Sequence, residues 1–153
     1  MEKLELKIPP VGVFLLFVLA MWLTAKITPA YPFNATFRGL VISLALAVGA
    51  VYGLGGVAAF RRAGTTVNPL DPNSSSSLVT GGIYRFSRNP MYVALLFTLA
   101  AWGLFLANFY ALAIATLFVP WMNRFQIGPE ERAMERLFGD EFERYKKTTR
   151  RWL

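Results

Sequence analysis

The sequence predicts an all-α integral membrane protein, a bundle of four transmembrane helices with a cytoplasmic C-terminal amphipathic helix. Hydrophobic residues make up 55% of the 153 residues and charged residues only 16%, whereas about a quarter of a soluble domain is charged. Charges are also absent from stretches long enough to cross a bilayer core of roughly 30 Å. The basic residues collect in segments that would share one side of the membrane.

Two apolar runs near the start predict the first two spans, at about 11–27 and 39–60. We expect the first run to be a retained span, because no small-residue cleavage site follows it. The second run contains no charged residue over its whole length. Its Gly49 and Gly53 form a pair of small residues four positions apart, which lets a neighbouring helix approach closely.

The apolar stretch 91–126 predicts a helical hairpin. As one helix it would be roughly 54 Å long, far more than a bilayer needs. We expect the turn around residues 107–109, which gives spans at about 91–106 and 109–125. Pro120 should kink the second of these spans.

The distribution of basic residues predicts that both termini are cytoplasmic. In that orientation 14 of the 16 basic residues face the cytoplasm, and only Lys26 and Arg38 lie outside, as the positive-inside rule requires. The net charge of +7 would also suit nucleic acid, but topology explains it and we expect no nucleic acid partner. The basic tail indicates affinity for anionic lipid headgroups.

Two cytoplasmic segments, 63–90 and 128–153, complete one predicted domain of residues 1–153. The first is turn-rich and long for a structureless loop, which favours a functional role. In the second, Pro129 suits the first turn of a helix, and the two glutamates after it suit the positive helix end. Apolar residues then recur at helical spacing around a break near Gly139. They predict an amphipathic helix that lies on the membrane surface or caps the bundle: Met134, Leu137, Phe138, Phe142 and Tyr145.

Cysteine and histidine are both absent from the chain, which narrows the chemistry. No disulfide, thiolate nucleophile or thiolate metal site can form, and the commonest general base and metal ligand is missing. We expect no metal site. Any chemistry must use carboxylates, phenols, basic side chains, hydroxyls, amides or a bound cofactor.

One polar cluster, residues 82–92, directly precedes the third span. Pro90 should begin a helix whose unpaired N–H groups face the cytoplasm and attract anions. Arg88 beside it offers a bidentate contact to a carboxylate, and Gly82 permits close backbone approach. The alternative is a surface turn whose arginine and tyrosine side chains anchor at the lipid headgroups.

A second polar cluster combines Glu130 and Glu131 with the basic and aromatic end 145–152. A carboxylate here suits the paired hydroxyls of a ribose, or a cation. Helix-start electrostatics and side chains that reach the membrane interface explain the same residues without a ligand.

Together the two clusters form a specific pattern. It consists of Gly-x-Tyr-x-x-x-Arg-x-Pro-x-Tyr at 82–92, an apolar hairpin, Glu-Glu at 130–131, Phe-Gly-x-Glu-Phe at 138–142, Tyr145 and Arg151-Trp152. The pattern resembles the isoprenylcysteine carboxyl methyltransferase and phospholipid methyltransferase family of membrane enzymes, from about Phe60 to the C-terminus. Residues 61–69 resemble what precedes this motif in bacterial members, which implies a bacterial or archaeal plasma membrane.

The resemblance implies methyl transfer from S-adenosylmethionine to a lipophilic small molecule or lipid at the cytoplasmic membrane boundary. The acceptor group is a carboxylate, a thiol or an amine. The implied catalytic residues are Glu130, Glu131 and Arg151. The implied cofactor-binding residues are Gly82, Tyr84, Arg88, Asn89, Pro90, Tyr92, Glu130 and Glu131. Asn89 stands where the family usually has histidine, so hydrogen bonding is retained there but protonation-dependent chemistry is not.

Two other functions stay open at this point. Some membrane sterol reductases are similar to this family in their cofactor region, so an NADPH-dependent reductase is one alternative. The other is a non-catalytic membrane interaction protein, in which Gly49 and Gly53 would control self-association.

Overall fold

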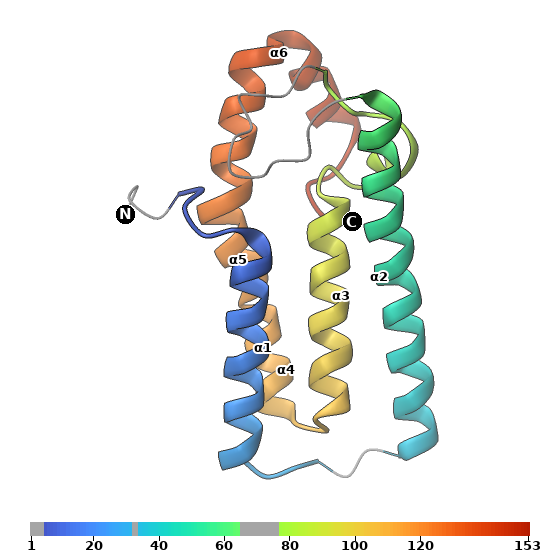
Figure 1. Ribbon diagram of the computed structural model, residues 1–153, viewed down its shortest axis with the longest axis vertical. Helices are drawn as coiled ribbons and strands as arrows, with labels where there is room; N and C mark the ends of the chain where they lie inside the picture. Colours follow the sequence, from blue (N-terminus) through green and yellow to red (C-terminus); the bar gives the residue numbers. More distant parts are fainter. Residues whose placement is uncertain (1–4, 32–33, 65–76) are drawn as a thin grey trace.

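The computed structural model describes residues 5–31, 34–64 and 77–153, and all regular secondary structure in this part of the chain is helical. The predicted all-α class is therefore confirmed for these residues, while most of the turn-rich part of 63–90 lies outside them. Figure 1 shows long helices side by side, with α6 folded over one end. The elements are α1 (Pro10–Ile27), α2 (Ala35–Ala63), η3 (Gly82–Arg85), α3 (Pro90–Phe105), α4 (Phe109–Thr116), α5 (Phe118–Met122), η4 (Asn123–Ile127) and α6 (Gly128–Thr148).

Helices α1 and α2 are long and apolar enough to cross a membrane, and they contain the predicted spans 11–27 and 39–60. Large apolar side chains cover their outer faces and are more than half exposed, including Leu15 at 57%, Leu44 at 65% and Leu54 at 73%. A helix that is apolar all round is normally buried in a core or a bilayer. These outer faces therefore suit lipid.

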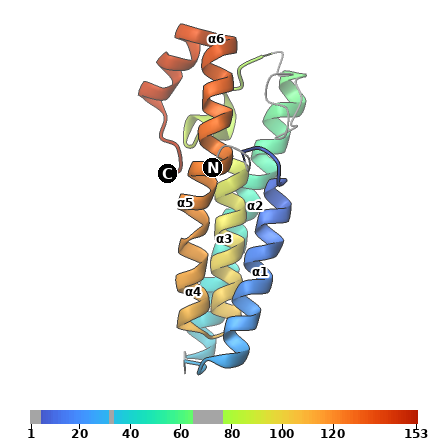
Figure 2. The ribbon, with the colours of Figure 1, turned by 90° about the vertical axis from the view of Figure 1, so that its left-hand side faces the viewer.

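Helix α3 lies between α2 on one side and α1 and α4 on the other (Figures 1 and 2). Three glycines of α2 let α3 approach closely. A Cβ atom added to Gly56 would lie 2.9 Å from Met91 Cγ, and one added to Gly49 would lie 3.3 Å from the Ala94 carbonyl oxygen. At Gly53 it would lie 3.3 Å from the Cβ of that same alanine. The close approach predicted from the glycine pair thus occurs within the chain.

The predicted hairpin turn is present, since α3 ends at Phe105 and α4 begins at Phe109. Buried Asn108 caps α4 by accepting a hydrogen bond from the Ala111 N–H at 2.9 Å. Its amide nitrogen donates to Thr28 Oγ1 at 2.8 Å and to the Pro29 carbonyl oxygen at 3.2 Å. One side chain therefore joins the hairpin turn to the segment that follows α1.

The returning arm of the hairpin is interrupted and then continues into α6. Helix α4 ends at Thr116, four residues before Pro120, as expected because a proline ring clashes with the carbonyl four residues earlier. The π-helical turn η4 follows α5 and runs directly into α6. Figure 2 shows α4, α5 and the first half of α6 one above another.

Two apolar clusters hold these elements together. The larger lies among α1, α3, α4 and α5 and includes the fully buried Met21, Leu99, Phe118 and Met122. The smaller lies at the α6 end and consists of Tyr84, Phe142 and Tyr145, with Phe60, Met134 and Phe138 packed against it. Gly139 has a φ of +47°, which breaks α6 and brings its second half back over the bundle (Figure 1).

Candidate functional site

The two polar clusters of the sequence meet at the α6 end of the bundle. Tyr92 OH donates a hydrogen bond to Glu130 Oε1 at 2.5 Å. Arg88 Nη2 lies 2.7 Å from Glu131 Oε1. The apolar hairpin that separates these residues in sequence returns the chain to the end from which it started (Figure 1).

Glu131 lies between two guanidinium groups. Arg88 binds Oε1, and Arg151 binds the same oxygen through Nε at 3.1 Å and Oε2 through Nη2. The side chains of Arg88 and Glu131 are only 11% and 13% exposed. Burial raises the pKa of Glu131, but the hydrogen bonds from Arg151 and Arg88 outweigh it, so the pKa is below its ordinary value. Glu131 is therefore a fixed anion at neutral pH.

Glu130 has different surroundings from its neighbour. Its Oε1 accepts hydrogen bonds from Tyr92 OH and from Gln126 Nε2, the latter at 2.6 Å. The pKa of Glu130 is raised to about 7. Burial is the main cause and the Glu131 charge adds to it, whereas the two hydrogen bonds act in the opposite direction. Two adjacent carboxyl groups thus differ in protonation behaviour, as acid–base pairs in active sites do.

The C-terminal segment 149–153 runs across the start of α3 and carries Arg151 with it. The Arg88 N–H donates to the Arg150 carbonyl oxygen at 2.9 Å, and Asn89 Nδ2 donates to the Arg151 carbonyl oxygen at 2.9 Å. On its other side, Trp152 Nε1 donates to Asn123 Oδ1 at 3.0 Å. The segment is therefore fixed to both α3 and η4. Asn89 contributes to this attachment through its side-chain amide.

The start of α3 differs in one respect from the sequence prediction. Pro90 does begin the helix, but two of the N–H groups that lack an α-helical partner at a helix start are already paired. The Asn89 N–H donates to Ser87 Oγ at 3.1 Å, and the Tyr92 N–H donates to the Asn89 carbonyl oxygen at 3.0 Å. The carboxylate that Arg88 binds is an internal one, Glu131.

Glu130 and Glu131 lie in the first turn of α6, as predicted. Helix α6 begins at Gly128, with Pro129 in its first turn as predicted. However, η4 runs into it without a break, and the Gly128 N–H donates to the Asn123 carbonyl oxygen. Side-chain hydrogen bonds and ion pairs stabilise the two carboxylates.

The other predicted residues shape the site rather than join its ion pairs. Gly82 is exposed at the start of η3, and its φ of +62° suits glycine. Buried Tyr84 accepts a hydrogen bond on its carbonyl oxygen from Tyr145 OH at 2.6 Å, and burial raises the pKa of the Tyr84 phenol. Buried Pro90 packs near Gly56 of α2.

Sequence reasoning missed two residues around the site. Gln126 lies one helical turn before Glu130 in an otherwise apolar run, and this spacing could have predicted the hydrogen bond between the two side chains. Glu5 binds Arg124 at 3.3 Å and also Arg132, while the Leu6 N–H donates to the Phe125 carbonyl oxygen at 3.1 Å. No local pattern predicts this contact between the N-terminal segment and η4.

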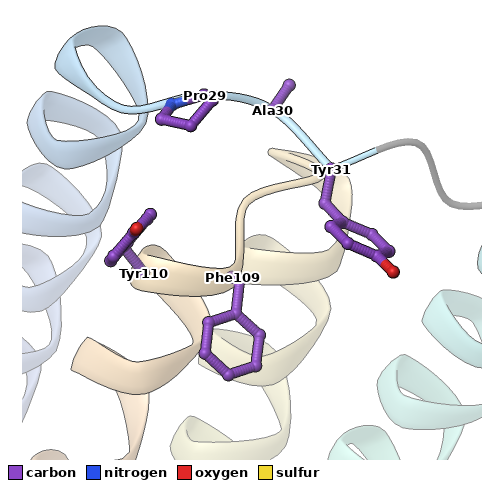
Figure 3. A pocket seen from close by; sticks show the side chains of 5 residues that line it. All are labelled: Pro29, Ala30, Tyr31, Phe109 and Tyr110. Carbon is purple, nitrogen blue, oxygen red and sulfur yellow. The ribbon is translucent and has the colours of Figure 1, made fainter.

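A pocket at the opposite end of the bundle has different chemistry (Figure 3). It is lined by Pro29, Ala30, Tyr31, Phe109 and Tyr110. None of these described lining residues carries a carboxylate or a guanidinium group, so the α6 end is the better candidate for a functional site.

The fold and the site together define a helical bundle with lipid-suited outer faces and a carboxylate–guanidinium site at one end. A model of the phospholipid methyltransferase family matches residues 37–141, and the chain belongs to this family of membrane methyltransferases. The match contains Arg88, Tyr92, Glu130 and Glu131, whereas Arg151 lies beyond it. An uncharacterised protein of Haemophilus influenzae is 48% identical over 63 residues, which are 41% of this chain and 100% of that protein. No solved structure matches.

Proposed function

We propose that this protein is an integral membrane methyltransferase that uses S-adenosylmethionine to methylate a lipophilic acceptor at the cytoplasmic membrane boundary. The observation that supports this most strongly is the contact between the two polar clusters, Arg88 with Glu131 and Tyr92 with Glu130. In a membrane methyltransferase family, such a site is where a water-soluble methyl donor and an oily acceptor can meet.

The proposal includes four membrane spans with both termini in the cytoplasm. Helix α3 has 16 residues and is about 24 Å long, and the arm 109–127 is about 28 Å long, so both approach the thickness of a bilayer core. Basic residues at the site end include Arg61 and Arg85, whereas Lys26 and Arg38 lie at the opposite end. This asymmetry supports a cytoplasmic site.

The residues of the site fit the chemistry of S-adenosylmethionine, which carries a carboxylate, an ammonium group, a sulfonium and a ribose diol. Guanidinium groups bind carboxylates, and carboxylates bind cations and paired hydroxyls. Arg88 Nε is a buried donor with no partner in the described part of the chain, so the site has donor capacity left. We assign cofactor binding to Gly82, Tyr84, Arg88, Asn89, Pro90, Tyr92, Glu130 and Glu131.

The main task of the protein in this reaction is alignment and exclusion of water. When bound, S-adenosylmethionine supplies an electrophilic methyl group on a sulfonium. Arg88 and Arg151 hold the Glu131 carboxylate in one orientation, so its charge is fixed before the reactants arrive. Arg151 is itself held in place because the C-terminal segment 149–153 is hydrogen-bonded to both α3 and η4.

Ligand-induced thermal stabilisation tests this function. S-adenosylhomocysteine should raise the melting temperature of the detergent-purified protein, and NADPH should not. Glu131→Gln and Arg88→Met should each reduce the shift, measured against the melting temperature of the same variant without ligand. The matched control is Glu135→Gln, one turn further along α6, where the side chain is 40% exposed.

Other outcomes would change the interpretation. Equal shifts of melting temperature in all three variants would exclude Glu131 and Arg88 from cofactor binding. Stabilisation by NADPH alone would favour the reductase, and no stabilisation by either compound would favour a non-catalytic membrane protein.

A further inference from the structure

The adjacent glutamates of the site differ in what neutralises them. Glu131 binds two arginines, whereas no cationic side chain binds Glu130 in the described part of the chain. Both hydrogen bonds to Glu130, from Tyr92 and Gln126, reach Oε1. Within the same described residues, Oε2 of Glu130 receives no hydrogen bond.

This arrangement is hard to explain by structure alone. A glutamine at position 130 could accept the same two hydrogen bonds through its amide oxygen, without the cost of enclosing a charge that has no cationic partner. The titratable groups that face Glu130 are Tyr92 from α3, Tyr84 from η3 and the neighbouring Glu131. None of these is a cation, so the carboxyl group is able to take up a proton.

We propose that Glu130 accepts a proton from the methyl acceptor, and that the acceptor therefore carries hydrogen on its nucleophilic atom, as thiols, phenols and amines do. This inference rests on the proposed function and narrows its acceptor class. A carboxylate acceptor is already ionised at neutral pH and gives Glu130 nothing to accept.

In the transfer from a methylsulfonium donor to an acceptor X–H, a bond forms between X and the methyl carbon while the bond between that carbon and sulfur breaks. The electron pair of the broken bond stays on sulfur, and the proton of X passes to Glu130 Oε2. The products are methylated X, a thioether and a protonated Glu130, which then returns its proton to water.

Tyr92 and Gln126 act as positioning residues in this scheme. Their hydrogen bonds hold Oε1 and so direct Oε2 away from themselves. Because burial raises the pKa of Glu130 to about 7, the group exchanges its proton near neutral pH, where general bases are most effective.

The first test measures transfer from labelled S-adenosylmethionine, at saturating cofactor, to four probes with the same alkyl chain. The probes are an alkanethiol, an alkylphenol, an alkylamine and a fatty acid. We expect at least one of the first three to be labelled, and Glu130→Gln to lower that rate at pH 7 by about 10²-fold or more. Glu143→Gln, on the exposed side of α6, should leave it unchanged. Labelling of the fatty acid alone, or a loss below threefold in Glu130→Gln, would overturn the inference.

The second test does not depend on turnover. Infrared difference spectra should show the carbonyl band of a protonated carboxyl group titrating near pH 7 in the wild-type protein and not in Glu130→Gln. In Tyr92→Phe the midpoint should move to higher pH, because a hydrogen bond that favours the ionised form is lost. A titration that persists in Glu130→Gln would assign it to another group and exclude Glu130 as the base.

S-adenosylhomocysteine binding distinguishes failure of the proposed methyltransferase function from failure of the proposed role of Glu130. If the wild-type protein does not bind it, the proposed function fails. If binding is intact while Glu130→Gln transfers methyl groups at the wild-type rate, only the role of Glu130 fails.

Discussion

Replacement of Arg88 by methionine would remove the ion pair at the centre of the site. The Arg88 side chain is 11% exposed and binds Glu131 at 2.7 Å, the Thr149 carbonyl oxygen, and the Lys146 carbonyl oxygen at 3.4 Å. Removal of one partner of a buried pair costs roughly 3–5 kcal/mol. Because Arg151 still neutralises Glu131, we expect the lower end, about 3 kcal/mol of unfolding free energy.

The assay is equilibrium unfolding in mixed micelles, with Arg85→Met as the control because Arg85 is an exposed arginine three residues earlier. That control should change stability by less than about 0.5 kcal/mol. In a double-mutant cycle with Glu131→Gln, the two changes should be non-additive by at least about 1 kcal/mol. Additive effects, or an Arg88→Met protein as stable as the control, would refute the paired arrangement.

Three further predictions use the same unfolding assay. The pKa of Glu130 rises from 4.5 to about 7 on folding, so between these pH values the folded protein binds one proton that the unfolded chain does not. The free energy of unfolding should therefore fall by up to about 3 kcal/mol as pH rises through this window. The same pH dependence in Glu130→Gln would contradict this. Gly56→Ala places a Cβ 2.9 Å from a side chain of α3 and should lower the free energy of unfolding by about 1–2 kcal/mol. The control Gly39→Ala, where the Cβ has nothing within 4 Å, should be neutral or stabilising. Equal effects of the two substitutions would exclude the close α2–α3 contact. Gly139→Ala forces a side chain onto a φ of +47° and should lower the free energy of unfolding by about 1–2 kcal/mol. The control Gly81→Ala, where φ is −89°, should not lower it. A Gly139→Ala protein as stable as the wild type would rule out the break in α6.

The helices and the hairpin turn were predictable because their signals are local. Apolar runs bounded by charges or prolines mark α1 and α2, and the length of the run after Met91 requires a turn. The turn falls at Asn108 because this residue caps α4 and binds Thr28 and Pro29. Those long-range partners could not be read from the sequence.

The site was only partly predictable, for a related reason. The pattern of motifs indicated which residues belong together, but not how their charges are distributed. Whether Arg88 binds Glu131 or Glu130 depends on the hairpin and on the return of the C-terminal segment. Glu130 and Glu131 do lie in the first turn of α6, but the sequence did not indicate that η4 runs into this turn, because a π-helical turn has no simple local signature.

Photo-crosslinking of labelled S-adenosylmethionine, followed by peptide mapping, tests most directly whether the α6 end of the bundle binds the methyl donor. We predict saturable labelling of peptides that contain residues 82–92 and 128–152. This labelling should be competed by S-adenosylhomocysteine and reduced in Glu131→Gln. Competed labelling confined to Tyr31, Phe109 and Tyr110, at the opposite end of the bundle, would contradict this prediction.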